Sequence, residues 1–113
     1  GNLLEALKLE DKAREDLQAA IVRLHSEIAQ TQERFVSIAA EIQSLEQEVL
    51  PGAKSAYDAA SIGFENGKFN FLEVLDAQRT YFSAKSQYLK AIAEALRAGA
   101  EMERLLGGPI SSD

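Results

Sequence analysis

The stretch GFENGKFNFLEVLDAQRTY, residues 63–81, decides the fold because two long helical patterns meet within it. Asn66 and Gly67 together form a turn signal. Gly67 can take the left-handed conformation that closes a helix at its C-terminal end without the steric penalty of a Cβ atom. The stretch therefore predicts a sharp reversal between two helices, with a tip turn at residues 66–70.

The residues after this turn carry the signals of a helix start. Asn70 stands at the N-cap position, where its side-chain oxygen can accept a hydrogen bond from the backbone amide of Glu73. The Glu73 carboxylate can reach back to the Asn70 amide, which completes a capping box with asparagine as the cap. Phe69 and Val74 lie at the spacing of a hydrophobic staple. These signals predict that a second helix begins at about residue 71.

The chain before the turn carries a heptad seam. From residue 17 onward, seam residues recur at alternating spacings of four and three, and all except Thr31 are apolar: Leu17, Ile21, Leu24, Ile28, Thr31, Phe35, Ile38, Ile42, Leu45 and Val49. A repeat of about 3.5 residues under-winds an α-helix and seats each seam residue against a neighbouring helix. His25 has no cysteine or second histidine at metal-ligand spacing, so a solvated position is expected. The pattern predicts a helix over about residues 3–65.

Pro51 disturbs this first helix. Proline has no amide to donate to the carbonyl of Gln47, and its ring crowds that turn at a cost of about 3 kcal/mol in a helix interior. The helix therefore kinks or ends at this point. Residues 53–64 return at once to a helix-forming composition, which favours a kink. Two separate helices are the alternative.

The second helix, expected over about residues 71–106, has two apolar rows. Its seam contains Val74, Ala77, Tyr81, Ala84, Tyr88, Ala91, Ala95, Ala98, Met102 and Leu105. A row beside the seam makes the apolar face wider than one partner helix needs, and it contains Phe71, Leu75, Phe82, Leu89 and Leu96. Gly107, Gly108 and Pro109 then supply a C-cap and a stop. A loose tail is expected over residues 107–113.

The two arms differ in length. At about 1.5 Å per residue, the first arm would be about 90 Å long and the second about 55 Å. Folded back from Gly67, the second arm reaches only to about residue 28, so earlier apolar residues lack a partner within the hairpin. An apolar stripe left in water calls for another chain. The sequence thus predicts an all-α fold, a long antiparallel helical hairpin, that self-associates or packs on a missing partner segment.

Composition narrows the function classes. The chain has 113 residues, a net charge of −6 and no cysteine. The acidic balance, without a cluster of lysine and arginine, argues against a nucleic-acid partner, and the lack of thiols excludes disulfides and thiolate metal sites. No apolar run approaches the roughly 20 residues of a membrane span, and no signal peptide is expected. No nucleophile, base and orienting group form a specific pattern, so neither an enzyme nor a cofactor is predicted.

Several short motifs around the turn resemble those of one protein family. Residues 63–89 resemble the C-terminal repeat of TolC-like outer-membrane efflux channels, in the heavy-metal cation efflux branch of cobalt-zinc-cadmium or copper-silver type. The motifs that carry the resemblance are Gly-Lys-Phe at 67–69, LEVLDAQRT at 72–80, Val-Leu-Pro at 49–51 and ERLLG at 103–107. The resemblance spans about residues 45–107.

The resemblance implies one hairpin of a trimeric channel. In that family three chains form a tube of long helices that crosses the periplasm and is closed at the bottom by inward-leaning hairpins. There it meets a periplasmic adaptor that links the channel to an inner-membrane pump. By this resemblance, the adaptor-contacting tip would contain Gly67, Lys68, Phe69 and Asn70. The outer-membrane strands would lie in segments absent from this chain.

The resemblance also implies roles for single residues. Glu73 and Asp76 fall at the positions of lumen-facing acidic residues near the closed end, and their spacing puts both on one helix face. Around a three-fold axis they would form acidic rings that favour cations. Phe64 falls where the family commonly has a tyrosine that ties neighbouring hairpins together, although phenylalanine lacks the hydroxyl. Tyr81 and Tyr88 are further candidates for packing between hairpins.

Alternatives remain at two levels. Glu73 is explained by the capping box alone or by the cap together with lumen lining. Asp76 is explained by lumen lining, by pairing with Arg79, or by its favourable place in the first turns of a helix. For the whole chain, the alternative to a channel segment is a free-standing coiled-coil module that binds a partner helix. The heptads fit both functions equally, and only the tip motif favours the channel.

Overall fold

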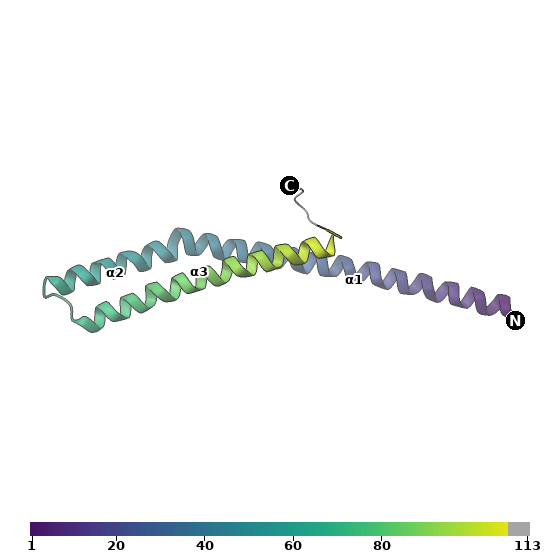
Figure 1. Ribbon diagram of the computed structural model, residues 1–113, viewed down its shortest axis with the longest axis horizontal. Helices are drawn as coiled ribbons and strands as arrows, with labels where there is room; N and C mark the ends of the chain where they lie inside the picture. The colour runs from purple at the N-terminus through teal and green to yellow at the C-terminus, as the bar shows by residue number, and fades with distance from the viewer. Residues whose placement is uncertain (109–113) are drawn as a thin grey trace.

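The chain folds as a long helical hairpin (Figure 1). The computed structural model describes residues 1–108, which form α1 (Asn2–Ser44), a π-helical turn η1 (Leu45–Val49), α2 (Leu50–Glu65) and α3 (Phe71–Leu105), without a strand. α3 runs back along α2 and the second half of α1, and the molecule is 94 Å long. The predicted all-α hairpin with a longer first arm is confirmed. Beyond Gly108, the predicted loose tail lies outside the described residues.

The first arm stays helical past Pro51. The Leu50 amide donates to the carbonyl of Leu45, five residues back, which is the hydrogen bond of a π turn. A π turn is wider than an α turn, so it gives the proline ring room beside the preceding carbonyls. Figure 1 shows the arm bending between α1 and α2. The expected kink is therefore present, and the helix does not break into two separate helices.

The π turn also moves the buried seam by one residue. Leu45 is 4% exposed, and the buried or half-buried residues that follow it include Leu50, Ala53, Tyr57 and Ala60. Val49, which the heptad pattern places in the seam, is 40% exposed. The prediction for Val49 is wrong because counting heptads assumes an α-helix without an extra residue in any turn.

Small side chains form the core of the hairpin. Ala84, Ala91 and Ala98 of α3, at intervals of seven residues, are each no more than 3% exposed. Every predicted seam residue of α3 is buried or half-buried. On α1, Ile38 and Thr31 are buried as well, and Thr31 is only 2% exposed although it is the one polar residue of the seam. Alanine at these positions lets the two helices approach closely.

α3 ends in a glycine cap. Gly107 has a φ of 90°, and its amide donates to the carbonyl of Arg104 at 3.2 Å. The Gly108 amide donates to the carbonyl of Glu103 at 2.9 Å. These two hydrogen bonds form a Schellman motif, which satisfies carbonyls that the end of a helix would otherwise leave free. The cap predicted at Gly107 is confirmed.

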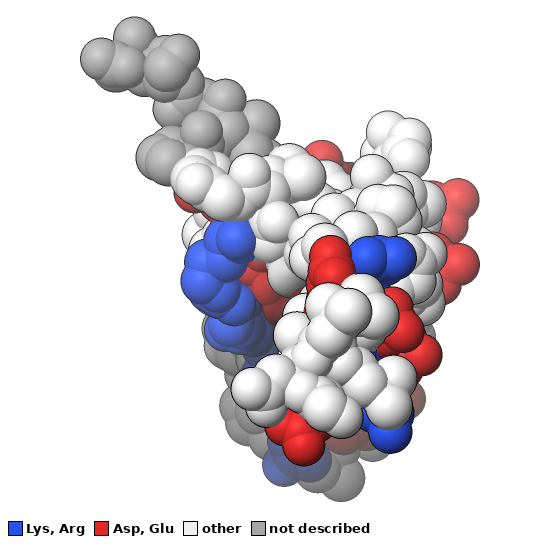
Figure 2. Space-filling model, turned by 90° about the vertical axis from the view of Figure 1, so that its right-hand side faces the viewer, with Lys and Arg blue, Asp and Glu red and all other residues white. Residues whose placement is uncertain are grey.

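The N-terminal part of α1 continues beyond the end of α3. An ion pair of 2.7 Å between Arg34 and Glu101 ties α1 to the last turns of α3. Before that point apolar side chains stay exposed, among them Leu3 (75%), Leu7 (49%) and Leu17 (61%). Figure 2 looks onto this end and shows uncharged surface interrupted by acidic and basic side chains. We call residues 2–27 the overhang. No helix within residues 1–108 is both long and apolar enough to cross a membrane.

Candidate functional site

The tip turn, residues 66–70, begins with a closed helix end. Gly67 has a φ of 73°, a conformation that favours glycine. Its amide donates to the carbonyl of Phe64 at 3.0 Å, and the Lys68 amide donates to the carbonyl of Gly63 at 2.7 Å. These are the two hydrogen bonds of a Schellman motif. The chain therefore leaves α2 in one defined direction.

Gly63 is a tip residue that the sequence analysis did not single out. A Cβ atom at this position would lie 2.1 Å from Cδ2 of Phe69, and the Phe69 amide donates to the Gly63 carbonyl at 3.2 Å. The Phe69 ring thus rests on the bare backbone of α2, while 45% of the residue stays exposed. A glycine inside an otherwise regular helix, six residues before a phenylalanine, is the signal that could have pointed to this contact.

Asn70 caps the start of α3 as predicted. Its backbone is extended, with φ −88° and ψ 169°, and its Oδ1 atom accepts a hydrogen bond from the Glu73 amide at 3.0 Å. The returning hydrogen bond of a full capping box, from the Asn70 amide to the Glu73 carboxylate, is not among those formed within residues 1–108. The Glu73 carboxylate is therefore not held by the cap.

Glu73 and Asp76 place two carboxylates just above the tip. Both residues are exposed, and their spacing puts them on one side of α3. The ion pairs within residues 1–108 join Arg14 to Glu10, Arg34 to Glu101 and Lys54 to Asp58. The alternative pairing of Asp76 with Arg79 is therefore not formed. Both acidic groups face solvent in this structure.

The aromatic residues near the tip pack within the hairpin. The rings of Phe64 and Phe71 are 5.6 Å apart, centroid to centroid, at an interplanar angle of 54°. Those of Tyr57 and Tyr81 are 6.1 Å apart. Such tilted pairs join α2 to α3 and stabilise the hairpin beyond the area they bury. A role of Phe64 or Tyr81 between neighbouring hairpins stays a prediction.

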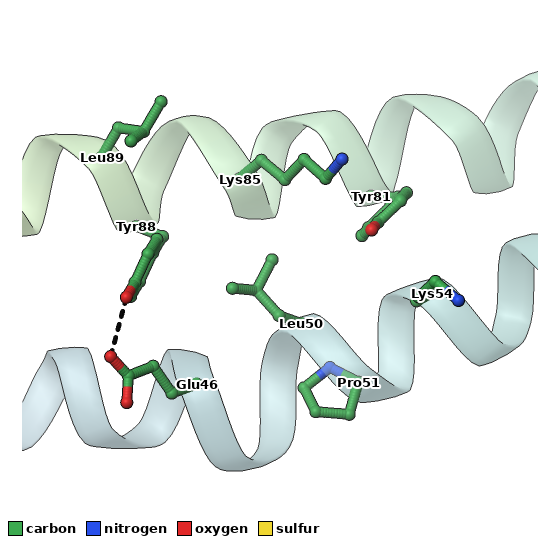
Figure 3. A pocket seen from close by; sticks show the side chains of 8 residues that line it. All are labelled: Glu46, Leu50, Pro51, Lys54, Tyr81, Lys85, Tyr88 and Leu89. Carbon is green, nitrogen blue, oxygen red and sulfur yellow. Dashed lines mark hydrogen bonds between the residues drawn. The ribbon is translucent and has the colours of Figure 1, made fainter.

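Tyr88 links α3 to the π turn. Its hydroxyl donates to Oε1 of Glu46 at 2.7 Å, as the dashed line in Figure 3 shows. This hydrogen bond, then the partial burial of the phenol and the nearby carboxylate charge, raise the pKa of Tyr88 above its usual value. The contact lies inside the hairpin. The predicted role of Tyr88 between hairpins is untested.

A groove opens beside this link, on one side of the helix pair. We call it the apolar groove, and it is lined mainly by Leu50, Pro51, Tyr81, Lys85, Tyr88 and Leu89. In Figure 3 Leu50 reaches from the first arm toward α3, whereas Leu89 extends from α3 to the side that faces away from the first arm. The Lys85 ammonium lies 4.4 Å from the centre of the Tyr81 ring, a cation–π distance. The residues of the tip and of this groove do not form a catalytic arrangement.

Acidic residues and His25 do not gather into a metal site. Within residues 1–108, no group of three or more histidine, aspartate or glutamate side chains is placed to hold an ion. His25 lies exposed on α1. The acidic pair above the tip contributes two carboxylates per chain, and no third acidic or histidine side chain among the described residues joins them.

Comparison with known proteins places this hairpin in a family. Residues 2–108 match the family described as outer membrane efflux protein, and the chain belongs to that family. It is a family of transport proteins and not of enzymes.

One relative gives a finer comparison. Over 107 residues the chain is 42% identical to the cobalt-zinc-cadmium resistance protein CzcC of Cupriavidus metallidurans. The alignment covers 95% of this chain and 26% of CzcC, so the chain spans about a quarter of the length of that relative. No solved structure matches the chain.

Proposed function

We propose that this chain is a periplasmic hairpin of a trimeric outer-membrane efflux channel, which exports metal cations together with an adaptor and an inner-membrane pump. The family match over residues 2–108 carries the proposal. The name of the relative, which refers to cobalt, zinc and cadmium, supports divalent metal ions as cargo. A transported ion passes through, so the hairpin needs no resident metal site.

The tip turn would meet the adaptor. All five of its residues are exposed, and hydrogen bonds at both ends fix its backbone. Phe69 presents apolar surface beside the charge of Lys68. A turn that is already rigid loses little conformational entropy when a partner binds it. These features support docking of a second helical hairpin end to end.

The carboxylates of Glu73 and Asp76 would line the entrance at the periplasmic end of the channel. Neither is held by a partner side chain within the described residues, so both stay available to passing ions. Three copies around an axis would concentrate negative charge, which attracts cations and makes the carboxylates repel each other when the entrance narrows. The entrance would therefore favour cations and resist tight closure unless the charges are screened.

The test removes this charge from the full-length channel. Glu73→Ala combined with Asp76→Ala should change the conductance of the periplasmic end in planar bilayers and lower the preference for cations, because the charge that attracts cations is removed. The matched control is Glu48→Ala with Asp58→Ala, which removes two exposed carboxylates from η1 and α2 and should change neither property. Unchanged conductance and cation preference in the first variant would remove Glu73 and Asp76 from the entrance.

A free-standing coiled-coil module is the second candidate function, and the exposed apolar residues of the overhang favour it. An antibody against this chain, used on fractionated source cells, separates the two. A much longer protein in the outer membrane is expected for the channel. A soluble protein of this length would overturn the channel and leave a module whose partner helix covers the overhang.

A further inference from the structure

The two sides of the helix pair differ in chemistry. Opposite the apolar groove, a second groove is lined by Val49, Arg79, Thr80, Ser83, Ala84 and Gln87. Apart from Arg79, these residues carry no charge, and three of them offer hydroxyl or amide groups. Thr80, Ser83 and Gln87 are all exposed. We call this second groove the polar groove.

Helix geometry separates the two grooves. Ala84 is 3% exposed and points into the core. Successive side chains of an α-helix are about 100° apart, so Ser83 and Lys85 project to opposite sides of Ala84. Thr80 and Gln87 share the side of Ser83, while Tyr81 and Tyr88 share the side of Lys85. The two grooves thus flank the buried alanine line of α3.

The polar groove continues the line of the tip carboxylates. Five residues follow one another at spacings of three and four along one side of α3: Glu73, Asp76, Thr80, Ser83 and Gln87. At about 1.5 Å per residue, the stretch from Asp76 to Gln87 is about 17 Å long. A path along this side therefore begins at two carboxylates and goes on over three uncharged polar side chains, with the Arg79 guanidinium also in the lining of the groove.

The Thr80 hydroxyl is oriented by the helix. Its Oγ1 atom donates to the carbonyl of Asp76 at 3.1 Å. Because the hydroxyl hydrogen of Thr80 is used in this bond, its oxygen can act only as an acceptor toward the groove. Oxygen lone pairs suit a hydrated cation.

We propose that the polar groove is the part of the conduction path directly above the acidic entrance, and that Thr80, Ser83 and Gln87 line it. This inference rests on the proposed channel function. An ion drawn in by carboxylates must leave them to move on, and neutral dipoles bind it more weakly than a second acidic ring would. The opposite side of α3 is a poor lining for ions because it exposes a row of large apolar side chains: Phe82 (53% exposed), Leu89 (66%) and Leu96 (72%). Exposed apolar rows of this kind usually pack against another protein surface.

The test is thiol modification of single cysteines in the full-length trimer, recorded in planar bilayers. Thr80→Cys, Ser83→Cys and Gln87→Cys each add one reactive group per chain to a segment that contains no cysteine of its own, and the unsubstituted full-length channel treated with the same reagents gives the background response. An anionic methanethiosulfonate should raise the cation-to-anion permeability ratio by about twofold or more, and a cationic one should lower it, as charges lining a pore do. Leu89→Cys, on the opposite side of α3, is the matched control and should not respond.

The outcomes separate this inference from the channel proposal. A conducting channel that responds at Leu89→Cys and not at Ser83→Cys overturns the assignment of the polar groove and leaves the channel function standing. A conducting channel in which none of the three polar positions responds overturns it as well. Absence of any conductance from the unmodified full-length protein overturns the channel function itself. Ser83→Asp checks the result without reagents, because it should raise the cation preference by placing a charge directly in the groove.

Discussion

The overhang and the paired part of the hairpin contain the same heptad pattern and differ in burial. Ile38 and Leu45, which face α3, are each 4% exposed, whereas Leu17 in the overhang is 61% exposed. The difference arises because α3 ends at the Gly107 cap, level with about residue 30 of α1. A heptad pattern therefore specifies which face of a helix is apolar, and the length of the partner helix decides how much of that face is covered.

A pair of leucine truncations gives the largest expected contrast between these regions. Leu45→Ala should lower the free energy of unfolding of the 113-residue chain by about 2–5 kcal/mol, because it removes a buried side chain and leaves a cavity. Leu17→Ala should change it by less than about 0.5 kcal/mol, as exposed substitutions usually do. Urea unfolding at low protein concentration, followed by circular dichroism, measures both. Equal losses would mean that a second chain covers the overhang in solution.

A second pair of substitutions, at two glycines of α2, compares a position that contacts the tip turn with one that does not. Gly63→Ala should destabilise the hairpin by about 1–3 kcal/mol, because the new methyl group displaces the Phe69 ring. Gly52→Ala is the matched control, since a Cβ atom there meets nothing within 4 Å. It should stabilise the helix by up to about 1 kcal/mol through helix propensity. Thermal melts of the two variants should move in opposite directions, and a shared upward shift would refute the contact between Gly63 and Phe69.

The sequence predicted those features that depend on local chemistry. The Gly67 turn, the Asn70 cap and the seam of α3 each follow from a few neighbouring residues, and the structure contains all three. The π turn before Pro51 was missed because it depends on how the chain relieves crowding around the proline. Thr31 is buried although it is the one polar residue of the seam, because its place in the heptad turns it toward the last turns of α3.

Site residues were predictable to a smaller extent. The sequence pattern placed Glu73 and Asp76 on one side of α3, but their role in an entrance came from a resemblance and not from their chemistry. The contact between Gly63 and Phe69 joins two segments across a turn, so it depends on the direction in which that turn leaves α2. The polar groove combines residues of α3 with Val49, whose position depends on the π turn.

The Asn70 cap provides a smaller test of the paired region. Asn70→Ala should cost about 1 kcal/mol, because the Glu73 amide loses its acceptor at the start of α3. Asn70→Asp is the control, since aspartate is an equally good cap and should preserve stability. Chemical unfolding of the three proteins compares them directly. A full loss in the aspartate variant would show that Asn70 acts through something other than its cap hydrogen bond.

The smallest effect is expected where Tyr88 meets the π turn. The neutral phenol donates to Glu46, and the pKa of Tyr88 is raised, so this link adds stability below the usual tyrosine pKa of about 10. That stability is lost as the pH rises through the higher pKa of the folded state. With Tyr57 and Tyr81 replaced by phenylalanine, tyrosinate absorbance reports Tyr88 alone. Glu46→Ala should move this titration to lower pH, whereas Glu48→Ala, also in η1, should leave it unchanged. An identical titration in all three proteins would mean that the hydrogen bond between Tyr88 and Glu46 does not persist in solution.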